Sequence, residues 1–215
     1  MDTIMEVTEQ TLSTPRKRSQ FLKGIMAASA GAAAIAATGP AGAAMAAGRL
    51  SVPQSDIDIL NYALTLEHLE AAFYATALVD VPFEQDIVKH LARVLRNDEN
   101  THVAALTAAI KQLGGTPVAA ARVYDFGNRT FKTQSGFLKL SYVLEDTGVH
   151  AYLGQAGNIK TPSLLLTAAS ILTVEARHAG AIRYQYGLAP TIAPFDTPLT
   201  KAQVLAAAGG FIKQQ

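Results

Sequence analysis

The segment Asp98-Glu99-Asn100-Thr101-His102 is the most informative part of the sequence, because it places two polar side chains in an otherwise apolar helical series. Around it apolar residues recur every three or four positions, and Glu99 and His102 take two consecutive places in that series. The series reads Val88, Ala92, Leu95, Glu99, His102, Leu106, Ala109 and Leu113. A spacing of three residues aims both side chains from one face of a helix. Since burying an unpaired carboxylate is costly, we expect a metal ion or a buried partner here.

A second Glu-x-x-His pair, Glu175-Ala176-Arg177-His178, lies in the same kind of frame between Ile171 and Ile182. Two further helical faces carry one core carboxylate each, at Glu67 and Glu145. Four helices would therefore bring four carboxylates and two imidazoles into one core.

Capping and turn residues predict the bounds of these helices. The first would begin at Ser55 as N-cap, with Asp56 and Asp58 in its first turn. Pro82 would occupy the first turn of the second helix, which ends at Gly114. The connection over residues 114–134 is unusually long, as expected if it runs the length of a bundle.

The third helix would begin near Ser135, and the fourth would open at Pro162 and stop at Gly187. A capping box at Thr200 and Gln203 predicts a short last helix, and no strand pattern is present. The fold class is therefore all-α: a four-helix bundle over residues 51–190, with a long crossover between helices two and three and a tail over 191–215.

The six core residues match a di-iron or di-manganese carboxylate centre of the ferritin-like type, in which two helices give Glu and two give Glu-x-x-His. Two divalent ions would balance four carboxylates, so that the buried site is neutral. Two iron ions are the cofactor we expect, with manganese as the alternative, although affinity alone would favour copper or zinc. The predicted ligands are Glu67, Glu99, His102, Glu145, Glu175 and His178.

Other polar residues border these ligands. Asp98 and Asp146 are candidates to hold the free N–H of an imidazole, Asp98 from a different helix, or else they are solvated surface residues. Tyr74 and Tyr142 could hydrogen-bond to ligands or serve the core alone. Glu70 would be an additional ligand, a gate or a buried hydrogen-bonded neighbour.

Three segments resemble the exported ferritin-like proteins related to plant desiccation-related proteins. They are residues 58–74 (DILNYALTLEHLEAAFY), 145–152 (EDTGVHAY) and 175–178 (EARH), and the resemblance extends over about residues 55–212. It implies a metal-binding bundle, an association with stress and export. The chain has no Cys, which excludes a rubredoxin-type iron site, and its short tail does not resemble the fifth helix of a large cage.

Residues 1–46 resemble an export signal. Arg16-Lys17-Arg18 and Lys23 precede a stretch, residues 24–48, that is rich in Ala and has no charge, and small residues lie near Ala46. The start is like a twin-arginine signal except that Ser19 replaces the second arginine, so the route stays open. We expect a periplasmic or cell-envelope protein; a retained N-terminal anchor is the alternative.

The sequence therefore predicts an exported protein that oxidises Fe(II), or reduces peroxide or dioxygen, at a dinuclear centre in stress protection. A manganese-catalase-like enzyme and a non-enzymatic protective bundle are the alternatives. The expected partners are metal ions and dioxygen or peroxide, and a homodimer is compatible with such a bundle. Nucleic acid is not expected, because the net charge is only +1.

Overall fold

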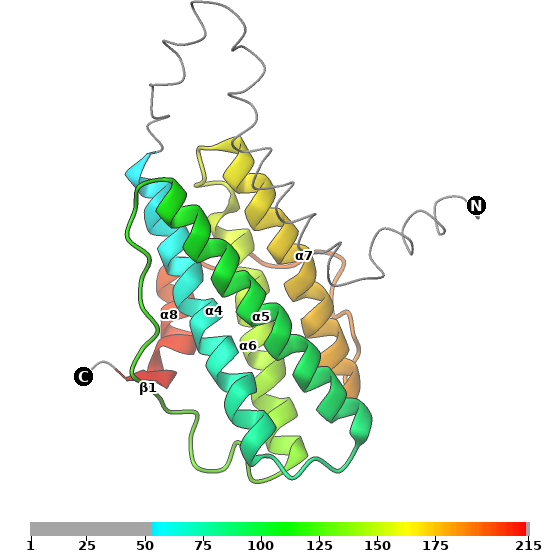
Figure 1. The fold of residues 1–215 in the computed structure, drawn as a ribbon. Coiled ribbons are helices and arrows are strands. Elements are labelled where there is room, and N and C mark those ends of the chain that lie inside the picture. The colour runs from blue at the N-terminus through cyan, green and yellow to red at the C-terminus, as the bar shows by residue number, and fades with distance from the viewer. Residues whose placement is uncertain (1–52, 214–215) are drawn as a thin grey trace, which may run out of the picture. The chain divides into compact units, whose positions relative to one another are not determined.

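The computed structural model describes residues 53–213 as a bundle of four long α-helices (Figure 1). They are α4 (Gln54–Asp80), α5 (Asp86–Gln112), α6 (Gln134–Ala156) and α7 (Pro162–Gln185). Helices α4 and α5 pack as one hairpin, and α6 and α7 as a second. The all-α fold class and the four-helix architecture are confirmed. The predicted export signal lies outside the described residues and stays a prediction.

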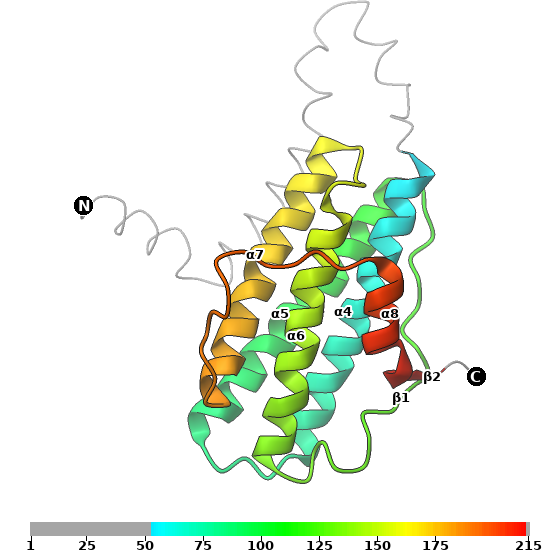
Figure 2. The same cartoon turned by 180° about the vertical axis from the view of Figure 1, so that it is seen from behind.

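The long crossover over residues 113–133 connects opposite ends of the bundle, as the sequence predicted (Figures 1 and 2). It runs beside α4, where the side chain of Asn61 donates to Thr116 O at 3.1 Å and accepts from Val118 N at 2.7 Å. Helix α6 consequently runs in the same direction as α5, with α4 and α7 opposed to them (Figure 1).

A short antiparallel pairing joins the crossover to the C-terminal segment. Strand β1 (Val123–Tyr124) pairs with β2 (Ile212–Lys213), just after α8 (Lys201–Ala208) and the 3₁₀ turn η1 (Gly209–Phe211). The expectation of no strand is therefore wrong for these residues. Two-residue strands carry no alternating pattern, and tertiary contact creates the pairing. The capping box at the start of α8 is confirmed, since Thr200 Oγ1 accepts from Gln203 N and the Gln203 side chain accepts from Thr200 N.

Two predicted helix starts are wrong. Helix α5 begins at Asp86 rather than at Pro82, because Gln134 Oε1 accepts from the backbone N–H groups of Glu84 and Gln85 and holds that segment as a loop. Helix α4 begins before Ser55, at Gln54, and no side chain caps it.

Asp56 has a different role from the one expected at a helix N-terminus. Its carboxylate is buried and accepts from the backbone N–H groups of Lys160 at 3.0 Å and Thr161 at 2.9 Å. It thereby fixes the turn between α6 and α7 against the start of α4.

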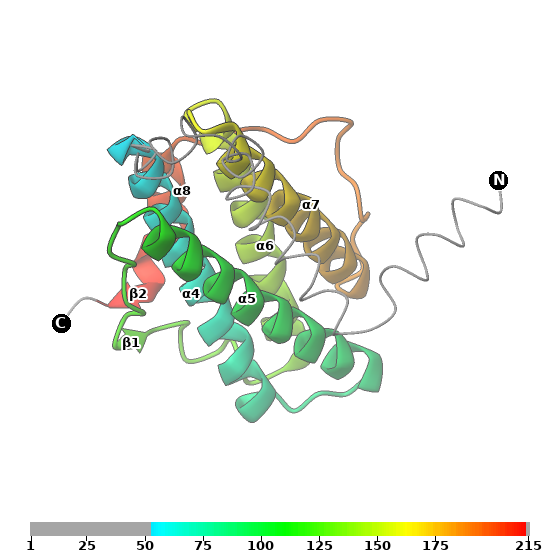
Figure 3. The same ribbon diagram turned by 45° about the horizontal axis from the view of Figure 1, so that its top comes forward.

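After α7 the chain forms a strap, residues 188–200, that crosses the outer side of α6 on its way to α8 (Figure 2). Leu199 N donates to His150 O at 3.1 Å, and a Cβ at Gly154 would lie 1.9 Å from Leu199 O. Glycine is therefore needed at position 154 for this close crossing. With the top of the bundle tilted toward the viewer, the strap is seen to pass outside α6 and α7 (Figure 3).

Within residues 53–213, none of the helices is both long and apolar enough to cross a membrane.

Candidate metal centre

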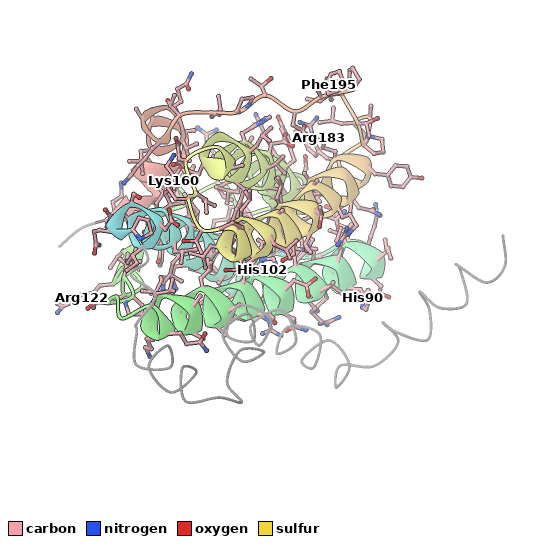
Figure 4. All side chains as sticks on the ribbon, turned by 90° about the horizontal axis from the view of Figure 1, so that it is seen from above. His90, His102, Arg122, Lys160, Arg183 and Phe195 are labelled. Carbon is pink, nitrogen blue, oxygen red and sulfur yellow. The ribbon has the colours of Figure 1, made fainter. Side chains whose placement is uncertain are left out.

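The six predicted ligands come together in the core, midway along the bundle. The four carboxylate residues are fully buried, and His102 and His178 are 7% and 5% exposed. Their ligand atoms form two groups, each within 4.8 Å, that we call the His102 position and the His178 position. The first comprises Glu67, Glu99, His102 and Glu175, and the second Glu99, Glu145, Glu175 and His178. Seen from above, His102 lies between α5 and α7 (Figure 4).

Three carboxylate oxygens surround the imidazole nitrogen at the His102 position. Nδ1 of His102 lies 3.1 Å from Glu67 Oε2, 3.1 Å from Glu99 Oε2 and 3.0 Å from Glu175 Oε1. The last oxygen has no hydrogen-bond partner despite this distance, so it is not aligned for a bond to the ring.

The His178 position has a similar arrangement, in which Glu99 and Glu175 each contribute their other carboxylate oxygen. Nδ1 of His178 lies 3.1 Å from Glu99 Oε1, 3.4 Å from Glu145 Oε2 and 3.7 Å from Glu175 Oε2. Glu99 and Glu175 thus offer one oxygen to each position, whereas Glu67 and Glu145 each serve a single one.

These contacts fit a metal ion better than they fit a hydrogen-bonded core. A neutral imidazole nitrogen carries at most one proton and cannot donate to three carboxylates at once. Five buried atoms in the centre have no hydrogen-bond partner, namely Glu99 Oε1, Glu145 Oε2, both Glu175 oxygens and His178 Nδ1. Buried polar atoms are normally satisfied, and one cation at each position would satisfy all of these. Carboxylate and imidazole donors suit iron or manganese.

The electrostatics of the centre show what the metal-free protein has to accommodate. Burial raises the pKa of Glu99 well above its ordinary value, and it raises that of Glu145 to about 7 against the attraction of His178. Burial alone would lower the pKa of His102 and of His178, but the surrounding carboxylates, Glu67 and Glu145 foremost, outweigh it and raise both. Without cations, the cluster therefore retains protons at neutral pH.

Two buried tyrosines donate hydrogen bonds to Glu67 and Glu145, the two carboxylates that belong to a single position each. Tyr74 donates to Glu145 Oε1 and lies 2.6 Å from Ser141 Oγ, and Tyr152 donates to Glu67 Oε1 at 2.5 Å. A hydrogen bond from Tyr74 to a ligand was one of the alternatives that the sequence left open, whereas the bond from Tyr152 was not predicted. The available signal was spacing, because each tyrosine lies seven residues after the core Glu of its own helix and binds the Glu of the other.

Asp98 was predicted to contact the imidazole of another helix, and its Oδ2 lies 3.3 Å from Nε2 of His178 on α7. The same expectation for Asp146 is wrong, because its carboxylate forms a bidentate ion pair with Arg183. Tyr142 does not reach a ligand either; it stacks on Tyr186 with ring centroids 5.5 Å apart. The guanidinium of Arg183 lies 5.7 Å from its ring centroid, so Asp146 and Tyr142 belong to one cluster outside the centre.

Glu70 is a fifth buried carboxyl group beside the centre, outside both metal-binding groups. A Cβ on Gly148 would lie 3.2 Å from Glu70 Oε1 and 3.8 Å from Glu175 Oε2, so the glycine leaves room for both carboxyl groups. Burial, and then the charge of Glu175, raise the pKa of Glu70 well above its ordinary value. Burial therefore disfavours the charged form of the Glu70 carboxyl group.

Comparison with known protein families agrees with this geometry. A search of curated proteins finds no match to the chain. The sequence matches the ferritin-like domain family over residues 55–188, which is more than half of its 215 residues and includes all six members of the centre. The chain therefore belongs to the ferritin-like domain family.

Proposed function

We propose that this protein binds two iron ions in the buried Glu/His centre and uses them to oxidise Fe(II) or to reduce peroxide or dioxygen. The observation that carries the proposal is that Glu99 and Glu175 each direct one oxygen toward each of two imidazole nitrogens. A carboxylate shared in this way holds two cations side by side, and a single structural ion would not need it.

Each residue has a distinct task in the proposed centre. Glu99 and Glu175 would bridge the two positions, and Glu67 and Glu145 would each complete one of them. Tyr152 donates a hydrogen bond to one oxygen of Glu67, and Tyr74 donates to one oxygen of Glu145. Each of these carboxylates would therefore offer its other oxygen to a metal ion. Iron, when bound, supplies one-electron redox chemistry at two adjacent positions. The surrounding apolar core would exclude water from the two metal positions.

Two further features support small oxidants as substrates. A cavity of about 20 Å³, lined mainly by apolar side chains of α4, α6 and α7, reaches Tyr152 and is large enough for a diatomic molecule or a water. Reduction of peroxide to two waters consumes two protons and two electrons. Glu70, a buried carboxyl group close to Glu175 whose pKa is raised by burial, would be the proton donor beside the proposed reaction site.

The proposed setting is the cell envelope or periplasm, with a role in stress protection. Its support is the basic start and the uncharged, Ala-rich stretch within residues 1–48. Mass spectrometry of the protein from the envelope fraction of its host tests this, and an intact Met1 in purely cytoplasmic material would refute it.

Metal content decides the main proposal. Protein purified from its native host should carry close to two iron ions per chain, and manganese instead would favour the catalase-like alternative. Anaerobically loaded protein should oxidise Fe(II) when peroxide or dioxygen is added. Glu99→Ala should lose bound metal and this activity, whereas Glu84→Ala, at an exposed carboxylate, should lose neither. A Glu99→Ala protein with full metal content and activity would refute the proposal.

A further inference from the structure

The two positions use the same kinds of ligand but are supported differently. At the His178 position, Asp98 Oδ2 lies 3.3 Å from Nε2 of the imidazole and fixes which nitrogen faces the centre. Tyr74 donates to Glu145, which completes this position, and Ser141 Oγ in turn lies 2.6 Å from the phenol oxygen of Tyr74.

The His102 position has fewer of these supports. Glu67 accepts one hydrogen bond from Tyr152, which has no second side-chain partner within the described part of the chain. No side chain among residues 53–213 hydrogen-bonds to Nε2 of His102, whose contacts are all made through Nδ1.

The sequence explains the difference. Asp98 immediately precedes Glu99 and reaches the histidine of the opposite Glu-x-x-His helix. The residue that precedes Glu175 in the second copy is Val174, which cannot accept a hydrogen bond. The two-fold repetition of the ligands therefore does not extend to the group that orients the imidazole.

We propose that the two metal positions are unequal, the His178 position binding its ion first and more tightly and the His102 position exchanging its ion. This inference rests on the proposed dinuclear centre. A carboxylate on the far nitrogen of a ligating imidazole fixes its tautomer and raises its basicity, and its loss typically lowers metal affinity about 10–100-fold. Asp98 is a positioning residue in this account. The exchangeable His102 position is then where substrate Fe(II) is taken up and released.

The asymmetry can be tested with Co(II) as the probe, titrated anaerobically into metal-free protein and followed by calorimetry and visible absorption. The parent protein should bind two ions in two steps that differ at least about tenfold in affinity. Asp98→Ala should weaken the first step by about tenfold or more and leave the second unchanged, so that the steps converge. Because the Asp98 side chain is 30% exposed, this substitution does not open the core.

A gain-of-function variant gives an independent measurement. Val174→Asp restores the missing carboxylate at the equivalent place and should tighten the second step alone. Asp58→Ala, at an exposed carboxylate remote from the centre in sequence, is the matched control and should change neither step. Two equal steps in the parent, or an Asp98→Ala variant that weakens the second step as much as the first, would overturn the asymmetry. Absence of any Co(II) binding would instead overturn the dinuclear centre itself, and this inference with it.

Discussion

Replacing Glu145 with Gln should stabilise the metal-free protein and weaken the metal-bound one. The substitution keeps the shape of the side chain, and the amide oxygen still accepts the hydrogen bond of Tyr74. It removes a negative charge that is fully buried among other carboxylates. The two states of the protein respond in opposite directions because burial outweighs the attraction of His178 in the metal-free protein, whereas a bound cation would make the charge favourable.

The magnitude follows from the pKa of Glu145, which burial raises from 4.5 to about 7. One pKa unit corresponds to about 1.4 kcal/mol, so ionising this group in the folded state costs about 3 kcal/mol above pH 7. The stabilising contribution of a group whose folded pKa is raised is fully present below pH 4.5 and is lost as the pH rises through 7. The metal-free variant should therefore match the parent near pH 4 and exceed it by up to about 3 kcal/mol at pH 8.

Thermal unfolding of chelator-treated protein at both pH values measures this difference. For a domain of this size, about 3 kcal/mol corresponds to a Tm increase of about 6–12 °C. Glu84→Gln, at an exposed carboxylate, is the matched control and should shift Tm at neither pH. With saturating Fe(II) the order should reverse, since the variant has lost a ligand oxygen and with it part of the stabilisation that binding provides. A variant no more stable than the parent at pH 8, or equally stabilised at pH 4, would refute the reasoning.

Three further outcomes are expected. Gly154→Ala places a Cβ 1.9 Å from Leu199 O, so it should displace the strap, cost about 1–3 kcal/mol and expose residues 188–200 to limited proteolysis, whereas Gly157→Ala, with open space around its Cβ, should not. Asp56→Ala leaves two backbone N–H groups before α7 without their acceptor and should cost about 2 kcal/mol in urea unfolding, while the exposed Asp58→Ala should be nearly neutral. Chelator should lower Tm more at pH 8 than at pH 6. The metal-free protein becomes less stable as the pH rises and its buried carboxyl groups ionise, whereas metal affinity rises as the ligands lose protons. An equal decrease in Tm at both pH values would contradict this.

The residues that form the centre could be predicted from sequence, because burying each of them in an apolar core has an energetic cost. A Glu or His in a core frame is unfavourable unless something compensates for it, so its position in the helical series already indicates a partner. All six predicted ligands lie in the centre for this reason. The long crossover was predictable on similar grounds, since the chain between Gly114 and Ser135 has to be accommodated.

The choice of partner among polar residues was not predictable, because it depends on how helices are placed against one another. Asp98 and Asp146 are each adjacent in sequence to a predicted ligand, Asp98 before Glu99 and Asp146 after Glu145. Asp98 nevertheless contacts His178, whereas Asp146 binds Arg183. Arg183 lies 37 residues after Asp146, and no local pattern connects the two. The prediction that α5 begins at Pro82 was wrong for the same reason. The side chain of Gln134, which is distant in sequence, binds the loop that precedes the helix.

The number of acidic groups in the core shows why metal, protons and stability are linked in this protein. Two divalent ions would neutralise four carboxylates, but five carboxyl groups are buried in and beside the centre, and Glu70 is the one outside both candidate metal-binding groups. Burial raises the pKa of Glu70 and so disfavours its charged form. Removing the ions leaves the remaining four in the same dry space, where protons have to replace the metal charge. If the centre holds metal, its acidic groups would exchange metal charge for protons when the ions leave, so metal removal and pH should act on stability together.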